Sequence, residues 1–128
     1  MSLRKKFNKG EVVFHEGNPS GDAYIISLGS IEIFENTASG QKVLGILGEN
    51  EIFGEMGLID GQPRSATARA REDSVVCVLT PKTFDNMVRE NPEALLPILK
   101  ILINRLRETM KFLKLGYKLP GTDRRHAI

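Results

Sequence analysis

Phe53-Gly54-Glu55-Met56-Gly57-Leu58 and Pro63-Arg64-Ser65-Ala66-Thr67-Ala68 are the two most informative segments of this sequence. They set one carboxylate, Glu55, and one guanidinium, Arg64, nine residues apart, with glycines flanking the acid and small hydroxyl residues following the base. This arrangement suits a ligand that carries both a sugar hydroxyl and a phosphate. A carboxylate accepts hydrogen bonds from the hydroxyl, and an arginine donates to two phosphate oxygens at once. Backbone N–H groups at the start of a short helix between the segments would add donors for the anion.

These segments resemble the phosphate-binding cassette of cyclic nucleotide-binding domains, whose pattern is roughly Phe-Gly-Glu-x-small-Leu, a short gap and Pro-Arg-Ser/Thr-Ala-Thr/Ser. The chain matches this pattern at Phe53, Gly54, Glu55, Gly57, Leu58, Pro63, Arg64, Ser65, Ala66 and Thr67. Upstream, residues 10–17 and 24–33 also resemble the opening strands of that family. The resemblance runs from about Phe7 to about Leu113, and it is far more specific than a lone glycine motif.

The resemblance implies a role for each part of the cassette. It assigns Arg64 to the cyclic phosphate, with the Ser65 hydroxyl and a backbone N–H beside it, and it assigns Glu55 to the ribose 2′-hydroxyl. Threonine at position 65 often accompanies a preference for cyclic GMP in this family, so Ser65 favours cyclic AMP over cyclic GMP. The ligand-binding residues expected within the cassette are Phe53, Gly54, Glu55, Met56, Gly57, Arg64, Ser65, Ala66 and Thr67.

One more ligand contact is expected on the last helix. In bacterial catabolite activator-like proteins a threonine on the long helix contacts the adenine amino group. The segment Arg105-Leu106-Arg107-Glu108-Thr109 places Thr109 near that position, although a solvated helix residue would fit the pattern equally well. Leu44, Ile52 and Leu58 also have two explanations, because apolar walls for the base and ribose are made of the same residue types as an ordinary core.

The two charged residues of the cassette have simpler explanations as well. An arginine is usually a surface residue, and an acid in the first turn of a helix can serve only to cap the helix and favour its dipole. The surrounding match is what favours phosphate binding for Arg64 and ribose binding for Glu55.

Length and composition describe an ordinary globular domain. The chain has 128 residues, of which 41% are hydrophobic and 27% charged, so one domain with a sizeable core is expected. The formal net charge of +2 is too small to argue for nucleic acid. No signal peptide or apolar run of about 18 residues is evident, and the single cysteine, Cys77, cannot form an internal disulfide, so a cytoplasmic location is expected.

Several residues are expected to have no binding role. Arg4-Lys5-Lys6 and Arg124-Arg125 fit solvated tails. His15 and His126 are too few and too isolated for a metal site, and no serine–histidine–acid motif is evident. We therefore expect neither a metal, a cofactor nor an enzymatic activity.

The hydrophobic pattern predicts mainly β structure with helices at the C-terminal end. Short strands separated by glycine turns are expected at 12–14, 23–28, 31–35, 42–47, 51–53, 65–70 and 74–80, which favours a β-roll of the double-stranded jelly-roll type. A short helix is expected at 55–59, and a second helix begins at Thr80-Pro81, an N-cap followed by proline. The domain is predicted to span residues 7–115, with the roll at 7–80, the helices at 81–115 and a tail at 116–128.

The last predicted helix carries an apolar seam. From Glu93 onward the apolar residues recur in steps of three or four, close to a heptad, and Gly116 is the expected end. The seam consists of Leu95, Leu99, Leu102, Leu106, Met110 and Leu113. It can pair with a second copy in a parallel homodimer, as in the catabolite activator family, or fold over the nucleotide as a lid, as in kinase regulatory subunits and channels. The homodimer is the favoured alternative.

The sequence therefore predicts a sensor that binds cyclic AMP or cyclic GMP and transmits its occupancy through the C-terminal helices, with a hinge near residues 90–92. No recognition helix is expected within these 128 residues, so direct binding of nucleic acid is not expected. Two alternatives stay open. One is a β-roll interaction or dimerisation domain without nucleotide, and the other is the sensor portion of a larger transcription regulator, channel or kinase.

Overall fold

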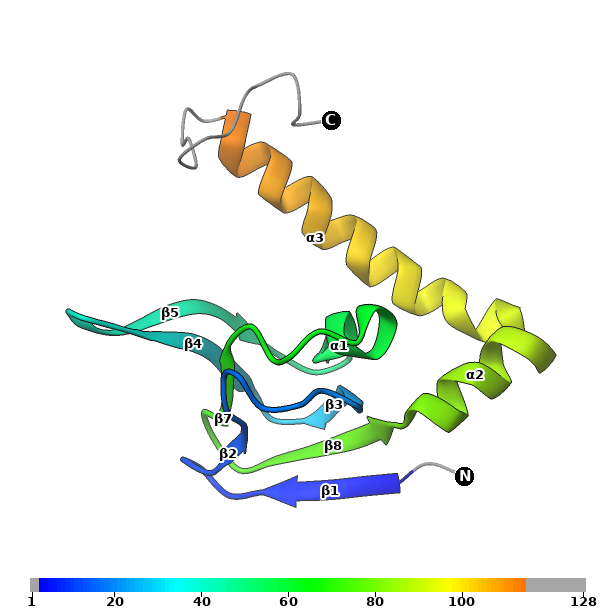
Figure 1. Cartoon of the computed structure of the whole chain (residues 1–128), viewed down its shortest axis with the longest axis horizontal. Coiled ribbons are helices and arrows are strands. Elements are labelled where there is room, and N and C mark those ends of the chain that lie inside the picture. The colour runs from blue at the N-terminus through cyan, green and yellow to red at the C-terminus, as the bar shows by residue number, and fades with distance from the viewer. Residues whose placement is uncertain (1–2, 115–128) are drawn as a thin grey trace.

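Two antiparallel sheets with helices at one end make up the computed structural model, which describes residues 3–114 (Figure 1). The strands are β1 (Leu3–Phe7), β2 (Val12–Phe14), β3 (Ala23–Leu28), β4 (Ile31–Thr37), β5 (Gly40–Leu47), β6 (Ile52–Phe53), β7 (Thr67–Ala70) and β8 (Ser74–Leu79). The helices are α1 (Glu55–Asp60), α2 (Pro81–Glu90), the 3₁₀ helix η1 (Pro92–Leu95) and α3 (Leu96–Lys114). The predicted β-roll with C-terminal helices is confirmed.

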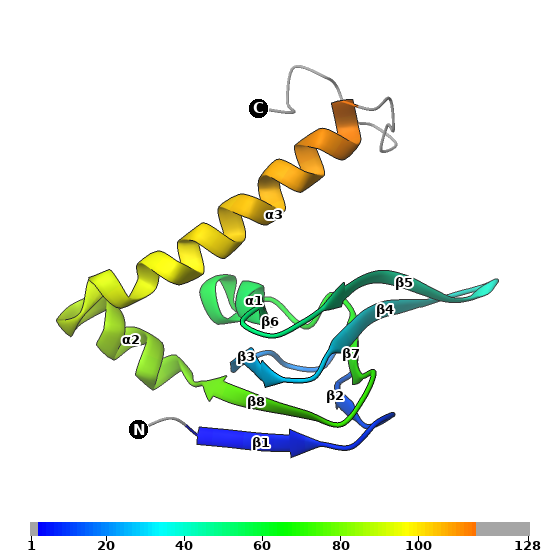
Figure 2. The ribbon, with the colours of Figure 1, turned by 180° about the vertical axis from the view of Figure 1, so that it is seen from behind.

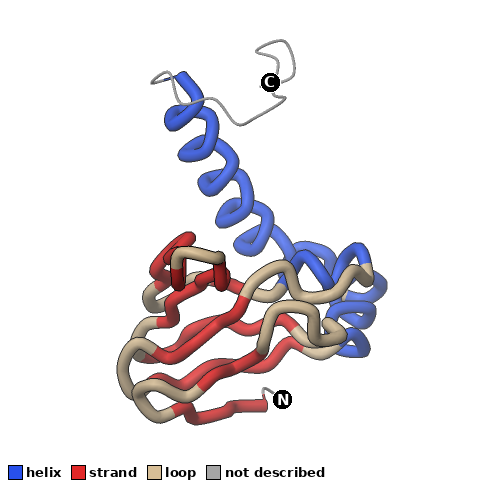
Figure 3. The backbone as a smooth tube through the Cα atoms, turned by 60° about the vertical axis from the view of Figure 1, so that its left-hand side comes forward, coloured by secondary structure: helices blue, strands red, loops and turns tan. Residues whose placement is uncertain are grey.

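The main core lies between the two sheets. One sheet has the strand order β1-β8-β3-β6 and the other has the order β2-β7-β4-β5, and the two face each other (Figure 3). Alternate side chains of a strand point to the same face, so each strand contributes every second residue to the core. The buried cluster draws on both sheets and consists of Phe7, Tyr24, Ile26, Ile31, Phe53, Ala68, Ala70 and Val76.

A second apolar cluster joins the helices to the first sheet. Its buried members are Ala23, Ile52, Leu79 and Ile98, and side chains from α1, α2, η1 and α3 pack against them. Helix α2 begins as predicted, since Thr80 Oγ1 accepts a hydrogen bond from the Thr83 N–H at 3.2 Å and Pro81 occupies the first helical position. The cluster therefore fixes the start of α3 beside the roll.

The prediction that Arg4-Lys5-Lys6 is a solvated tail is wrong. These residues form most of β1, which pairs along its whole length with β8, from Leu3 opposite Val78 to Phe7 opposite Ser74. Only Phe7 is buried, so the strand has no apolar alternation that could reveal it in the sequence. Charged side chains on such an edge strand discourage pairing with another chain.

The β4–β5 hairpin differs from its prediction in length and carries an irregularity. The register between β4 and β5 shifts between Ile33 and Phe34, which marks a β-bulge. The extra residue of the bulge is Leu44 on β5, because Gly45 lies opposite Ile33 and Val43 lies opposite Phe34. The β4–β5 hairpin runs longer than predicted and projects beyond the other strands (Figure 2).

Helix α3 divides the predicted seam between two faces. Leu95, just before α3, and Leu102 pack toward the roll with Ile98 and Ile101. In contrast, four residues on the other face are between 49% and 59% exposed: Leu96, Leu99, Ile103 and Leu106. Figures 1 and 2 show α3 running diagonally past α1 and away from the sheets.

Some of the predictions concern residues after Lys114. The predicted helix end at Gly116, the tail at 116–128, the pair Arg124-Arg125 and His126 all lie outside the described residues. Within residues 3–114, no helix is long and apolar enough to span a bilayer.

Candidate functional site

Helix α1 and its flanking glycines place the cassette at the mouth of the roll. Gly54 precedes the helix with φ +77°, a left-handed conformation that glycine adopts without strain. A Cβ at Gly54 would also lie 2.7 Å from Arg64 Nη1. A Cβ at Gly57 would collide with the side chain of Ser20. Both glycines are therefore needed for close packing around the cassette, and the predicted short helix is confirmed with one more residue, Asp60.

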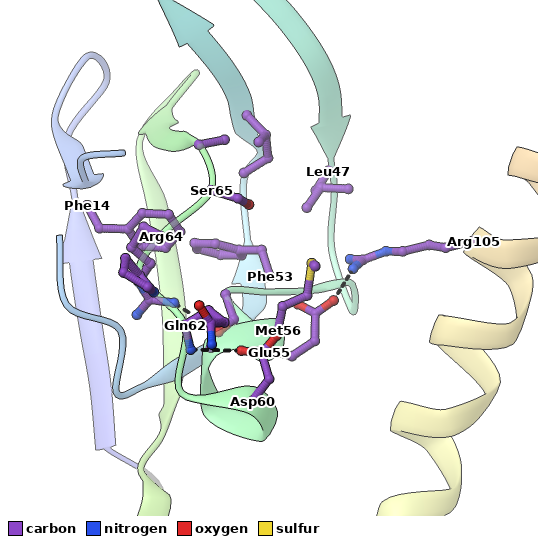
Figure 4. Close-up of a pocket in the computed structure, with 15 residues that line it drawn as sticks. Phe14, Leu47, Phe53, Glu55, Met56, Asp60, Gln62, Arg64, Ser65 and Arg105 are labelled. Carbon is purple, nitrogen blue, oxygen red and sulfur yellow. Dashed lines mark hydrogen bonds and ion pairs between the residues drawn. The ribbon is translucent and has the colours of Figure 1, made fainter. Parts of the chain in front are cut away.

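A cavity of about 350 Å³ opens between the cassette, the second sheet and α3 (Figure 4). This volume falls within the usual range for small-molecule sites, about 300–1,000 Å³. The cavity is lined by Phe14, Ile33, Leu47, Phe53, Gly54, Glu55, Met56, Gly57, Asp60, Gln62, Pro63, Arg64, Ser65, Ala66 and Arg105. Its walls combine apolar side chains with one buried acid and two arginines.

Arg64 is buried in this cavity without a carboxylate partner. Arg64 as a whole is only 8% exposed. Among the described residues, no acid forms an ion pair with it. Nη1 donates to the Gly54 carbonyl at 2.9 Å and Nη2 donates to the Asp22 carbonyl at 2.7 Å. Nε is buried and donates to no acceptor. A buried cation with an unused N–H is costly unless an anion completes it, so the chemistry of this end of the cavity suits an anion.

Glu55 is the buried acid of the cavity, and it is paired with α3. Arg105 Nη1 lies 2.7 Å from Glu55 Oε1, and Arg105 Nη2 donates to the Ile52 carbonyl. The Glu55 side chain is 8% exposed and that of Arg105 is 33% exposed. Within residues 3–114 no group donates to Glu55 Oε2, which leaves that oxygen able to accept from a ligand hydroxyl.

Eight of the ten predicted ligand-binding residues line the cavity: Phe53, Gly54, Glu55, Met56, Gly57, Arg64, Ser65 and Ala66. Thr67 does not line it, because strand alternation turns its buried side chain to the other face, where Oγ1 accepts from the Glu16 N–H at 3.0 Å. Thr109 does not line it either, since it is exposed on α3 and donates to the Arg105 carbonyl at 2.9 Å.

The apolar walls of the cavity are not the ones considered from the sequence. Ile52 and Leu58 pack in the cluster beneath the helices, and Leu44 is 51% exposed on β5. Ile33 and Leu47 provide the walls instead. Core packing is therefore the correct explanation for Ile52 and Leu58.

Seven lining residues were missed in the sequence: Phe14, Ile33, Leu47, Asp60, Gln62, Pro63 and Arg105. Arg105 lies one helical turn before Thr109, so the same helix face that suggested Thr109 could have suggested it. Phe14 reaches the cavity because β2 pairs with β7, and no local pattern in the sequence predicts that pairing. In the part of the chain that the structure describes, no group of three or more His, Cys, Asp or Glu residues could hold a metal ion.

Comparison with known sequences identifies the family. Residues 4–91 match the family profile described as the cyclic nucleotide-binding domain.

The chain belongs to the cyclic nucleotide-binding domain family.

Relatives of this cyclic nucleotide-binding domain include the Cyclic AMP receptor protein of Thermus thermophilus. The two are 32% identical over 106 residues, which cover 82% of this chain and 49% of that relative. The domain thus spans about half the length of the curated relatives that it matches first.

Three solved structures have a similar fold. The Thermus thermophilus Catabolite Activator Protein is 30% identical with a TM-score of 0.77, covering 89% of this chain and 54% of that one. The cAMP-bound form of the EAL enzyme Bd1971 is 35% identical with a TM-score of 0.65, covering 88% and 31%. A cGMP-bound form of that enzyme is also similar, at 35% identity and a TM-score of 0.65, covering 85% and 29%.

Proposed function

We propose that this domain binds a 3′,5′-cyclic nucleotide in the cavity and acts as a binding module without enzymatic activity. The observation that carries the proposal is the buried, unpaired guanidinium of Arg64, which shares one cavity with the buried carboxylate of Glu55. A singly charged cyclic phosphate would supply the missing anion, and the ribose 2′-hydroxyl would donate to Glu55 Oε2. The match to the family profile and the bound forms of Bd1971 support the same ligand class.

The proposed pose places each part of the nucleotide beside a matching surface. The phosphate lies between Arg64 and Ser65, whose exposed hydroxyl donates to no group within residues 3–114. The base lies against Ile33 and Leu47, which are apolar and sit beyond Glu55 on the second sheet. Apolar side chains can pack against a purine, but they cannot form hydrogen bonds with the polar groups that distinguish adenine from guanine. We therefore propose only a modest preference for cyclic AMP, based on Ser65.

Isothermal titration calorimetry with cyclic AMP, cyclic GMP and 5′-AMP tests the function directly. We expect both cyclic nucleotides to bind, with cyclic AMP the tighter of the two, and 5′-AMP to bind much more weakly because its second negative charge has no partner. A ligand at about 100 times its Kd should stabilise the fold by about 2.7 kcal/mol in a thermal unfolding assay. A folded protein that binds neither cyclic nucleotide would favour the interaction-domain alternative.

Glu55→Gln should weaken cyclic AMP binding by about tenfold, because a neutral amide is a poorer acceptor than a carboxylate. The wild-type domain should discriminate against 2′-deoxy cyclic AMP, and Glu55→Gln should lose most of that discrimination. Calorimetry of both proteins with both ligands gives the four affinities of a thermodynamic cycle, in which one change is made in the protein and the other in the ligand. The matched control is Glu49→Gln. Glu49 is an exposed acid in the turn after β5, so this substitution should leave both affinities unchanged. Unaltered discrimination in Glu55→Gln would contradict the ribose role.

We further propose that ligand occupancy is transmitted to α3 through the Glu55–Arg105 pair. Glu55 belongs to the cassette helix and Arg105 belongs to α3, so one ion pair connects the sugar site with the C-terminal helix. A ligand hydroxyl on Oε2 draws charge away from Oε1 and changes the strength of this pair. A helix held by a bond of variable strength is a two-state element that the ligand can bias.

Arg105→Ala should uncouple α3 from the cavity. Hydrogen–deuterium exchange of residues 96–114 should respond to cyclic AMP in the wild-type domain and should stop responding in Arg105→Ala. The substitution should cost only about 1 kcal/mol of unfolding free energy, because a third of the Arg105 side chain is exposed and solvent screens the pair. Arg107→Ala, exposed two residues further on, is the matched control and should keep the response. A ligand response that persists in Arg105→Ala would contradict this route.

We also propose that α3 forms a parallel homodimer. The four exposed apolar residues Leu96, Leu99, Ile103 and Leu106 recur in steps of 3, 4 and 3, the spacing of heptad positions a and d. With that assignment, the e positions carry Lys100, Arg107 and Lys114. An antiparallel pair would set these cations against one another, whereas a parallel pair sets them beside the neutral g positions Leu102 and Thr109. The charges therefore favour a parallel pair over an antiparallel one.

The exposed apolar face of α3 also supports the second candidate, a domain that dimerises through α3 without binding nucleotide. The alternative of a sensor within a longer regulator, channel or kinase also stays open, since the chain spans about half the length of the relatives that it matches first. Cys77 is a free thiol, which supports a reducing compartment such as the cytoplasm.

A further inference from the structure

The guanidinium of Arg64 lies in a group of aromatic rings that come from outside the cassette. Its Cζ atom is 4.1 Å from the ring centroid of Phe14, on β2, and 5.9 Å from that of Tyr24, on β3. Figure 4 shows Phe14 and Arg64 on the same side of the cavity. The two rings also contact Phe53, with centroid distances of 6.0 and 5.1 Å. A distance near 4 Å between a cation and a ring centroid is the geometry of a cation–π contact.

The turn that follows β2 also holds the backbone of Arg64. Its N–H donates to the Asn18 carbonyl at 2.9 Å, and its carbonyl accepts from the Gly17 N–H at 2.8 Å. The turn that supplies both groups is closed by Asn18 Oδ1, which accepts from the His15 N–H at 3.0 Å. The segment from Phe14 to Asn18 thus fixes Arg64 at its main chain and at the head of its side chain.

The remaining contacts of the guanidinium lie in its own plane. The carbonyls of Gly54 and Asp22 take one N–H from Nη1 and one from Nη2. The Cζ atom at the centre of the group lies over the ring of Phe14, which makes no hydrogen bond with it. Burial raises the pKa of Tyr24 above its usual value, with Arg64 opposing and Asp22 adding to the effect, so that ring is a neutral phenol at physiological pH.

We infer that Phe14 is a positioning residue for phosphate binding, which holds the Arg64 guanidinium in one orientation by stacking on its face. This inference rests on the proposed function. The two carbonyls prevent rotation within the plane, and the ring prevents the plane from tilting. The guanidinium is then already ordered before a ligand arrives, so less rotamer entropy is lost when phosphate binds. The Nε–H and the second N–H groups of Nη1 and Nη2 are the donors left for the anion.

A purely structural role for Phe14 makes a different prediction. Phe14 is only partly buried and packs at the margin of the main core, so any apolar side chain of similar size could fill its place. A stacking role requires an aromatic ring, because the attraction comes from the quadrupole of the ring and its flat shape. A variant that keeps an aromatic ring at position 14 therefore distinguishes a stacking role from simple filling of the core.

The test compares Phe14→Leu, Phe14→Tyr and the control Phe7→Leu. Phe7 is a buried aromatic of the same core with no contact to Arg64, so Phe7→Leu matches the loss of a core ring. By calorimetry we expect Phe14→Leu to weaken cyclic AMP binding about tenfold and Phe14→Tyr to stay within about twofold of wild type. Phe7→Leu should also keep its affinity, although its Tm should fall. Equal affinities for Phe14→Leu and Phe14→Tyr would overturn the inference.

A second measurement does not depend on nucleotide binding. In the ligand-free protein, the Nε–H proton of Arg64 should show a ring-current shift and slow exchange with water in NMR spectra. Both should persist in Phe14→Tyr and disappear in Phe14→Leu. If the wild type binds no cyclic nucleotide, the proposed function fails, while these spectra still decide whether Phe14 orders Arg64. Spectra unchanged in Phe14→Leu would overturn the positioning role.

Discussion

Replacing Arg64 with alanine is expected to weaken the binding of cyclic AMP by about 2–4 kcal/mol, roughly 30- to 900-fold, because it removes a charge-assisted bidentate contact. Arg64 is the only arginine among the described residues that is both buried and without an acidic partner, so no neighbour can replace its charge. Calorimetry on the wild type and the variant measures the loss directly. No other single change in this domain is expected to affect binding as strongly.

Two further variants separate the charge of Arg64 from its shape. Arg64→Lys keeps the positive charge but cannot donate to the carbonyls of Gly54 and Asp22 together or stack on Phe14, so we expect it to recover only a small part of the affinity. Arg71→Ala removes an exposed arginine just after β7 and is the matched control for net charge. Binding by Arg64→Ala at wild-type affinity would refute the proposed site, provided that circular dichroism shows a folded protein.

Introducing glutamates at Leu99 and Leu106 together is expected to convert the proposed dimer into a monomer. Each leucine lies more than half exposed on the face of α3 that points away from the roll, at a d position of the heptad. Burying charges at these positions in both helices should raise the dimer Kd by about a thousandfold or more. Sedimentation equilibrium with and without cyclic AMP gives the association constants.

The control for this prediction carries charges on another face of the same helix. Asn104→Glu with Lys111→Glu occupies two exposed b positions and should leave the dimer intact. The orientation is checked with Leu99→Cys in a Cys77→Ser background. Residue 99 faces its own copy in a parallel pair, so a disulfide should form readily under mild oxidation. A wild-type domain that sediments as a monomer at all accessible concentrations would contradict the dimer.

Local patterns in the sequence predicted the cassette well. Helix α1 and its end at Gly61 depend on residues within a few positions of one another, and so does the start of α2 at Thr80-Pro81. The contiguous motif also predicted that Arg64 and Glu55 share one site, and both line the same cavity, while their roles in binding stay predictions. Where neighbours in sequence are also neighbours in space, composition and spacing contain enough information to place a residue.

Contacts between distant segments could not be predicted in this way. Strand β1 is stabilised by backbone pairing with β8, more than sixty residues later, and its three basic side chains reveal nothing of that pairing. Phe14 and Arg64 meet only because β2 pairs with β7. Arg105 reaches Glu55 because the cluster beneath the helices fixes the angle of α3. Each of these depends on the finished fold, which no window of the sequence contains.

The shared carboxylate of Glu55 has a consequence for how such a sensor can be adjusted. One oxygen bonds to α3 and, in the proposed function, the other accepts from the sugar, so the two interactions would draw on a single charge. By thermodynamic reciprocity, whatever the messenger does to the helix, the helix must do to the messenger with equal free energy. The threshold concentration and the amplitude of the response are therefore linked at this residue. Selection could alter them independently only through positions that contact one of the two partners and not the other.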